Sequence, residues 1–173
     1  TLRSRGLGDV YKRQARDLLP LGYEVHLFEK DPSGGGMMRS QIPAFRLPIE
    51  VLEEEVDQIL DMGVVCHFGE EITSMKAMLD QEFDAYFVGT GAPRGRDLDL
   101  PGRAEVDAYI HIGIDWLSSV AFGHTDSIEG KVIVMGGGNT AMDCCRTSLR
   151  LGAESVTVVV RSAFEVMKAS EWE

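Results

Sequence analysis

The sequence predicts an α/β fold of doubly wound parallel sheets, and two observations carry this prediction. Short apolar segments typical of strands alternate along the chain with longer segments of helical periodicity. In addition, the apolar segment 132–135 leads directly into a glycine cluster, which in turn opens a helical segment. Strands separated by helices pair in parallel, because each helix returns the chain to the same end of the sheet.

The predicted elements follow in order from residue 15. A helix ends near Leu21, and a short apolar strand closes on Glu29. Residues 48–62 are expected to form an amphipathic helix, because apolar side chains recur on one face and Gly63 follows. Further on we expect a strand over 64–68, a helix over 74–80, a buried strand over 83–89, a helix over 111–122 and a linker over 123–130.

The last part of the chain forms a predicted strand–helix–strand unit. Its strands are expected over 132–135 and 155–160, and its helix over 140–151, with Gly152 suited to the C-terminal cap. Units of this kind place the start of the helix at the carboxyl end of the first strand, where ligands bind in doubly wound folds.

Three small residues at the start of this helix fit the G-x-G-x-x-G/A pattern of dinucleotide-binding folds: Gly136, Gly138 and Ala141. In that pattern the first glycine makes the tight turn, and the second lets the backbone approach a pyrophosphate. The third position must be small so that the helix can pack closely on the strand. The amides at the helix start then face the anion.

The residue after the second strand bears on coenzyme choice. An NAD-preferring unit usually carries an acid there, which accepts a hydrogen bond from the ribose 2′-hydroxyl. Arg161 occupies this position, and Lys168 lies a little further on. Cations suit the extra 2′-phosphate of NADP, so we expect NADP over NAD. The alternative is an ordinary tight turn with a surface arginine.

A second nucleotide site is predicted in the front half of the chain. Glu29 closes a short strand and is placed to accept a hydrogen bond from a ribose hydroxyl. Gly34, Gly35 and Gly36 follow in a loop that allows the backbone to approach a ligand closely. This is the back half of another dinucleotide unit, although a solvated strand end is the alternative.

Taken together, these motifs resemble the small, flavin-containing subunit of glutamate synthase and its relatives, including the flavin module of dihydropyrimidine dehydrogenase. The matching segments are 22–30, 35–36, 42–48, 83–92, 100–102 and 136–153. Their order and spacing make the resemblance specific over roughly residues 15–173. It implies two Rossmann-like nucleotide-binding units: an FAD-binding domain interrupted by an NADP-binding domain.

The resemblance also implies a role for each matching position. On the FAD side, contacts to the adenosine ribose, pyrophosphate, adenine and flavin fall on Glu29, Lys30, Gly34, Gly35, Gly36, Met37, Arg46, Ile72, Thr90 and Gly91. On the NADP side, the phosphate loop and the cationic positions fall on Gly136, Gly137, Gly138, Asn139, Thr140, Arg161 and Lys168. Relatives often carry a second basic residue where this chain has Ser162, which makes the preference for NADP less secure.

Residues 1–14 depart from the family pattern. A complete FAD unit needs a first strand and its own glycine motif, but Gly6 and Gly8 follow no apolar strand. We therefore expect 1–14 to be a foreign or artefactual segment, 15–123 a partial FAD-binding domain, and 124–173 the N-terminal part of an NADP-binding domain. With an incomplete FAD unit, a truncated NADP unit and a sheet lacking its central strand, this chain alone is expected to be inactive and to hold FAD poorly.

The function implied for the parent protein is a flavin-dependent oxidoreductase that passes electrons from NADPH to FAD. The electrons then leave for an iron–sulfur domain or a large catalytic subunit. Cys66, Cys144 and Cys145 lack cluster spacing, so any clusters belong upstream or to a partner. No acid–base catalyst is assigned, because the cofactors carry the redox chemistry. Two alternatives stay open: a nucleotide-binding fragment without redox activity and, less favoured, an S-adenosylmethionine-dependent methyltransferase.

Composition narrows the class of partner. The net charge of −11 at pH 7 argues against nucleic-acid binding, which needs a basic footprint. No apolar run approaches the ~20 residues of a membrane span, and few cysteines with no signal peptide suggest the cytoplasm. The four histidines are scattered without metal-ligand spacing, and no metal site is predicted: His26, His67, His111 and His124.

Overall fold

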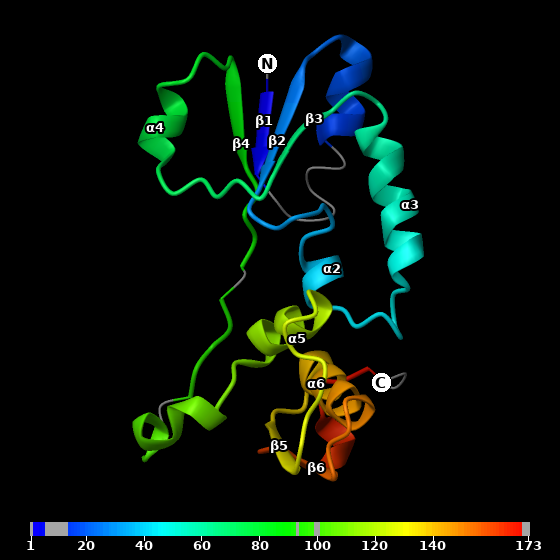
Figure 1. Cartoon of the computed structure of the whole chain (residues 1–173), viewed down its shortest axis with the longest axis vertical. Helices are drawn as coiled ribbons and strands as arrows, with labels where there is room; N and C mark the ends of the chain where they lie inside the picture. Colours follow the sequence, from blue (N-terminus) through cyan, green and yellow to red (C-terminus); the bar gives the residue numbers. More distant parts are fainter. Residues whose placement is uncertain (1, 6–13, 93, 99–100, 171–173) are drawn as a thin grey trace. The chain divides into compact units, whose positions relative to one another are not determined.

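The computed structural model describes residues 2–5, 14–92, 94–98 and 101–170. The chain divides into two compact units, Thr1–Arg39 with Leu47–Pro93, and Ser40–Arg46 with Arg94–Glu173. Each unit has its own parallel sheet (Figure 1). These bounds differ from the division predicted at residues 123 and 124, because the helix before that point packs against a helix after it.

The first unit is built on a sheet of strand order β3-β2-β1-β4, formed by β1 (Leu2–Arg5), β2 (Val25–Glu29), β3 (Val65–Phe68) and β4 (Ala85–Val88). Every neighbouring pair is parallel. The predicted doubly wound class is confirmed, since the chain runs outward through β2 and β3 and then crosses to the other side of β1.

Strand β1 corrects the expectation that this sheet lacks its central strand, while the foreign origin of residues 1–14 stays a prediction. Leu2 pairs with Val25 of β2 and with Ala85 of β4, so β1 occupies the central position that was expected to be empty. The prediction rested on the scarcity of apolar side chains. A parallel ladder is held by backbone amides and carbonyls, which every residue but proline supplies in full. Gly6 and Gly8 lie outside the described residues.

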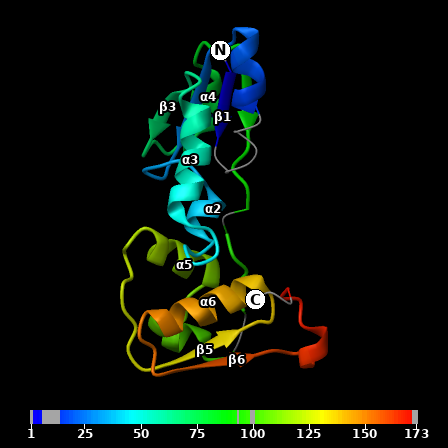
Figure 2. The same cartoon turned by 90° about the vertical axis from the view of Figure 1, so that its right-hand side faces the viewer.

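Helices flank this sheet at the predicted places, apart from one short helix over residues 37–40 that was not predicted. Residues 14–18 are helical and continue into η1 (Leu19–Leu21). They are followed by α2 (Met37–Ser40), α3 (Ile49–Leu60) and α4 (Met75–Leu79), with α3 and α4 on opposite sides of the sheet (Figures 1 and 2). Helix α3 buries Leu52 and Val56, two residues of its predicted apolar face. Helix α4 begins where Ser74 accepts a hydrogen bond from the Ala77 amide at 3.2 Å.

Strand β4 differs from its prediction as a buried strand. Phe87 is 36% exposed and Val88 is 54% exposed. The apolar run predicted its position correctly, but β4 is the last strand of the sheet and has a single neighbour, β1. An edge strand has less cover than a central one, and periodicity alone cannot tell the two apart.

The second unit contains the predicted strand–helix–strand arrangement. Strands β5 (Lys131–Met135) and β6 (Ser155–Val159) pair in parallel, and α6 (Asn139–Arg150) packs on both of them. Helix α5 (Gly113–Ala121) packs on α6, as Figure 2 shows. Two short 3-10 segments complete the unit, η2 (Arg103–Tyr109) and η3 (Phe164–Val166).

The β5–β6 pair has one covered face and one open face. Burial alternates along both strands, with Val132 and Val134 half-buried and Ile133 and Met135 exposed. Across the described part of the chain, no helix combines the length and apolar character needed to cross a membrane.

Candidate functional site

The loop between β5 and α6 has the geometry that its glycine pattern predicts. Gly136 adopts φ 144°, a region that disfavours side chains, and a Cβ there would lie 3.4 Å from the Cβ of Ala141. The amide of Gly136 donates to the carbonyl of Val159 at 2.9 Å, which ties the turn to β6. The positive φ thus favours glycine at position 136, and the small side chain of Ala141 lies within van der Waals contact of that turn.

The start of α6 is suited to an anion. Gly138 is the N-cap and supplies no side-chain acceptor, so no side chain caps this end of the helix. A Cβ on Gly138 would meet nothing within 4 Å, and the next two residues, Asn139 and Thr140, are exposed. Uncapped first-turn amides, together with the helix dipole, favour a phosphate at this point.

The segment after β6 folds back onto this loop. The carbonyl of Gly137 accepts hydrogen bonds from the amides of Lys168 at 3.0 Å and Ala169 at 2.9 Å. The side-chain oxygen of Asn139 accepts one from the amide of Ser170 at 2.8 Å. These bonds could not be predicted from the sequence, because hydrogen bonds between a backbone loop and a distant segment leave no residue pattern.

The two predicted phosphate-binding cations lie on this returning segment. Arg161 follows β6 after a single residue, and Lys168 lies beyond η3. Both residues are exposed. The structure thus places both cations on one segment whose end is fastened to the phosphate loop. Their contact with a 2′-phosphate remains a prediction.

In the first unit, Glu29 ends β2 as a buried acid. Its residue is 7% exposed, and its carboxylate accepts a hydrogen bond from the amide of Asp31 at 3.2 Å. Burial raises the pKa of Glu29, while that backbone hydrogen bond opposes the rise. A buried carboxylate with few donors of its own is well suited to accept a hydrogen bond from a sugar hydroxyl. Lys30 beside it is exposed.

The glycine loop after Glu29 is fixed by a side chain that the sequence did not single out. Arg39 donates from Nε to the carbonyl of Gly34 at 2.6 Å and from Nη1 to Glu53 at 3.2 Å. Gly35 is buried at φ 125°, and a Cβ there would lie 3.0 Å from the Cβ of Arg39 and 3.1 Å from Cδ2 of Leu52. Glycine is thus required at position 35.

The remaining predicted FAD contacts of this unit follow its strands. Glu29 ends β2, Ile72 lies in the loop after β3, and Thr90 and Gly91 lie in the loop after β4. Because these strands are parallel, their carboxyl ends meet at one edge of the sheet, where ligands of doubly wound folds bind. Gly36 precedes Met37, the exposed first residue of α2.

Arg46, matched to a flavin-nucleotide contact, has a protein partner that was not predicted. Its Nη1 donates to Oδ2 of Asp143 on α6 at 2.7 Å. The side chain of Asp143 is 4% exposed and that of Arg46 is 28% exposed. The preceding Phe45 has the guanidinium groups of Arg146 and Arg150 over its ring at 4.6 and 3.9 Å.

Asp143 and Arg46 form a partly buried ion pair. The two residues lie 97 positions apart, so no local pattern could have joined them. The flavin role of Arg46 stays a prediction beside this pairing.

Two of the four scattered histidines meet across β2 and β3. Nδ1 of His26 lies 3.0 Å from Nε2 of His67, and Nε2 of His26 lies 2.6 Å from a carboxylate oxygen of Glu24. The His67 ring stacks on Phe28 with centroids 4.1 Å apart. Among the described side chains, no group of three or more possible ligands could hold a metal ion. We interpret this pair as part of the packing between two strands.

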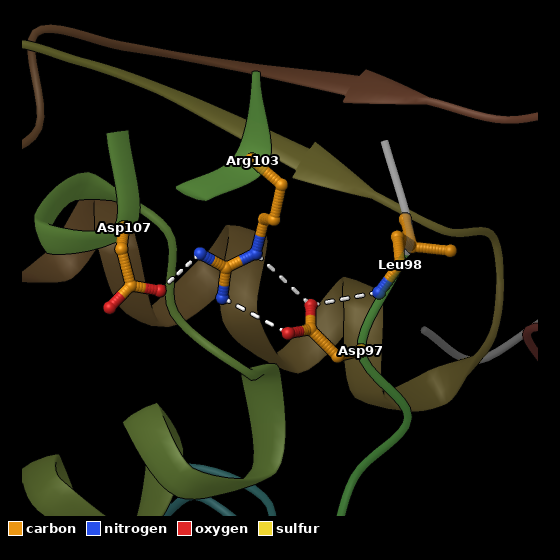
Figure 3. A network of polar contacts seen from close by, with 4 residues as sticks. All are labelled: Asp97, Leu98, Arg103 and Asp107. Carbon is orange, nitrogen blue, oxygen red and sulfur yellow. Dashed lines mark hydrogen bonds and ion pairs between the residues drawn. The ribbon is translucent and has the colours of Figure 1, made fainter. Parts of the chain in front are cut away.

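An exposed ion-pair network organises the connector between β4 and α5 (Figure 3). The guanidinium of Arg103 binds both carboxylate oxygens of Asp97, at 3.2 and 3.1 Å, and also Asp107. These bonds lower the pKa of Asp97 and raise that of Arg103. Exposed pairs add little stability, so the network contributes little to the free energy of unfolding. Leu100 of the family-like 100–102 segment lies outside the described residues.

Comparisons with known proteins agree with this geometry. The family model described as pyridine nucleotide-disulphide oxidoreductase matches residues 13–171. The NAD-dependent dihydropyrimidine dehydrogenase subunit PreT homolog of Salmonella typhi is 36% identical over 97% of this chain and 41% of its own length. The NADPH glutamate synthase small chain of Azospirillum brasilense is 34% identical over 97% of this chain and 37% of its own length.

The fold is also found in a solved structure. FprA of Mycobacterium tuberculosis in complex with NADPH superposes with a TM-score of 0.76 over 98% of this chain and 45% of that chain, at 19% identity. The chain thus spans less than half the length of each of these three proteins. A family model that covers nearly the whole chain, together with relatives at this level of identity, establishes membership: the chain belongs to the pyridine nucleotide-disulphide oxidoreductase family.

Proposed function

We propose that this chain is part of an FAD-dependent oxidoreductase of the glutamate synthase small-subunit type, which takes electrons from NADPH. The observation that carries the proposal is the presence, in one chain, of two parallel sheets that each end in a glycine loop. The loops after β2 and β5 contain glycines at positive φ, Gly35 and Gly136, and a side chain at Gly35 would also be crowded. Membership of an oxidoreductase family replaces the methyltransferase alternative.

The first unit offers a fit for the adenosine and pyrophosphate parts of FAD. Glu29 supplies a buried acceptor for a ribose hydroxyl, and the buried Gly34–Gly35 backbone, held by Arg39, allows close approach of the pyrophosphate. Bound FAD supplies the capacity to accept a hydride and to release electrons singly. The contribution of the chain is to bind and orient it, and no described residue is assigned a proton-transfer role.

The second unit offers a fit for NADP. The uncapped amides at the start of α6 receive the pyrophosphate, and Arg161 and Lys168 supply positive charge for the 2′-phosphate. Similar relatives carry both coenzymes in their names, NAD for the Salmonella typhi protein and NADPH for the Azospirillum brasilense protein. Arg161 is the reason to favour NADP, and Ser162 leaves only one cation directly after the strand.

The partner is proposed from the nature of the relatives. They are named as a subunit and a small chain, which supports assembly with other polypeptides. We propose that electrons leave through an iron–sulfur domain, fused or separate, toward a large catalytic subunit in the cytoplasm. The three cysteines of this chain are free thiols without cluster spacing, so the clusters would belong to that partner.

The test uses the full-length parent protein. Rapid mixing with NADPH should bleach the flavin absorbance, and NADH should do so more slowly. A parent protein that is purified without flavin and cannot take it up would contradict the proposal. A parent that binds both nucleotides but shows no bleaching would instead favour the alternative of a nucleotide-binding module without redox activity.

A further inference from the structure

Gly137 lies close to both ends of the segment that carries the two cations proposed to bind phosphate. At one end, a Cβ on Gly137 would lie 2.9 Å from Cγ1 of Val160, the residue before Arg161. At the other end, its carbonyl accepts the amides of Lys168 and Ala169 at 3.0 and 2.9 Å. Residues 161–167 therefore form a loop that starts beside Gly137 and is hydrogen-bonded to the Gly137 carbonyl just after its far end.

Asn139 extends this fastening with its side chain. It is the first residue of α6, and its Oδ1 accepts a hydrogen bond from the amide of Ser170 at 2.8 Å. Three consecutive amides, those of Lys168, Ala169 and Ser170, thus donate to the phosphate loop. Two of these bonds end on a backbone carbonyl, which substitution cannot remove. The third ends on the Asn139 side chain, which makes it the one that the sequence controls.

We propose that Asn139 is a positioning residue for recognition of the coenzyme 2′-phosphate, a role that rests on the proposed binding of NADP to this unit. Its side chain holds residues 168–170 against the phosphate loop, so that Lys168 is fixed beside the loop before the coenzyme arrives. The resemblance to the family implied a direct contact of Asn139 with the coenzyme, whereas the bond to Ser170 gives the side-chain oxygen a protein partner.

The physical reason is preorganisation. The Lys168 side chain is exposed, and an ordered backbone lowers the entropy lost when it engages a phosphate. NADH has no 2′-phosphate, so Lys168 does not contribute to its binding. Greater mobility of residues 168–170 should therefore weaken the binding of NADPH but not that of NADH. Loss of a direct contact to the pyrophosphate, which both coenzymes share, would weaken the binding of both.

The first measurement needs no coenzyme. Amide hydrogen exchange of the full chain, followed by NMR, should show protection at Ser170 that Asn139→Ala abolishes. Asn139→Asp keeps an acceptor oxygen in the same place and should restore that protection. The Gly136 amide, bound to Val159 on β6, reports whether each variant is folded. Equal exchange rates at Ser170 in the native chain and in Asn139→Ala would show that the Asn139 side chain does not hold this segment, which would overturn the proposal.

The second measurement is a double-mutant cycle on binding of NADPH and NADH to the same chain. Asn139→Ala should lower the affinity for NADPH about threefold to tenfold, the effect of one lost hydrogen bond, and leave the affinity for NADH unchanged. In a Lys168→Ala background it should change neither affinity, because the residue it positions is gone. Full additivity, or equal loss for both coenzymes, would overturn the positioning role. Failure of the native chain to bind either coenzyme would refute the proposed function. The exchange data would still show whether Asn139 holds the Ser170 amide.

Discussion

The two glycine loops of this chain both contain glycine at positive φ, but different groups hold them in place. In the first unit, a side chain fixes the loop: Arg39 binds the Gly34 carbonyl, and its Cβ and Leu52 fill the space beside Gly35. In the second, backbone fixes the loop: the Gly137 carbonyl receives two amides from the segment after β6. A loop fixed by side chains is open to disruption by single substitutions, whereas a loop fixed by backbone is protected from most of them.

The proposed recognition groups of the two loops differ as well. Glu29 is a buried acid whose pKa is raised by desolvation, while Arg161 and Lys168 are exposed cations. A buried acid discriminates through a hydrogen bond to a neutral hydroxyl, and exposed cations act through charge on a phosphate. The first site should therefore be sensitive to shape and pH, and the second to ionic strength.

The largest effect is expected from the loop fixed by side chains. Gly35→Ala should destabilise the first unit by about 2–5 kcal/mol, since positive φ costs about 1–2 and overpacking against Arg39 and Leu52 about 1–3. Urea unfolding of the chain gives the free energy. Gly22→Ala is the matched control, because Gly22 has φ 86° with nothing within 4 Å of its Cβ and should cost the conformational part alone. Equal losses in the free energy of unfolding for the two variants would mean that Arg39 and Leu52 move aside at no cost to accommodate the added methyl group.

The exposed cations of the other loop provide the next test. Arg161→Ala should weaken NADPH binding by about 1.5–3 kcal/mol, or about tenfold to a hundredfold, because a charge-assisted phosphate contact is lost. NADH binding should barely change. Titration with both coenzymes measures this, and Arg16→Ala, which removes an exposed cation from the first unit, is the control. Equal weakening of both coenzymes would make Arg161 structural, and no weakening would transfer the role to Lys168.

Much of this comparison could be predicted from the sequence. Periodicity placed α3, α4, α6 and the strands around them within a few residues, because those segments bury a regular apolar face. Glu29 and Gly136 were identified because a strand end and a glycine motif are local patterns. What the sequence did not reveal is non-local: the ion pair of Arg46 with Asp143, and the amides that converge on Gly137.

Strand β1 is an instructive failure of the same reasoning. The scarcity of apolar side chains was taken to exclude a parallel strand, yet Leu2–Arg5 pairs on both sides. Side-chain pattern predicts how a strand is buried, while pairing itself depends on the backbone and on the neighbours available. In this sheet β2 and β4 leave one position between them, and β1 fills it.

The ion pair between Arg46 and Asp143 tests whether side chains also stabilise the second unit. Arg46→Met should destabilise this unit by about 1–3 kcal/mol, less than the 3–5 of a fully buried pair because Arg46 is partly exposed. The reason is that the Asp143 carboxylate would stay buried without that cation. Thermal unfolding measures the loss. Adding Asp143→Asn should recover part of it, since a neutral amide needs no counter-charge. A double variant as unstable as Arg46→Met would show that packing of Arg46, and not charge, is what stabilises the unit.

The smallest effect concerns the buried acid of the first loop and is a dependence on pH. Because the pKa of Glu29 is raised in the folded chain, the folded state binds a proton more tightly than the unfolded state does. The stability that this supplies is present below pH 4.5, the ordinary pKa of glutamate, and is lost as pH rises through the raised pKa. Glu29→Gln cannot ionise, so it should match the native chain at acidic pH and become the more stable of the two toward neutral pH. Urea unfolding at a series of pH values compares them, with Glu54→Gln on the exposed face of α3 as the control. A difference in the free energy of unfolding between the two chains that is the same at every pH would mean that burial does not destabilise the Glu29 carboxylate. A gap that widens with pH would show that the chain keeps a costly carboxylate where the proposed ribose contact needs an acceptor.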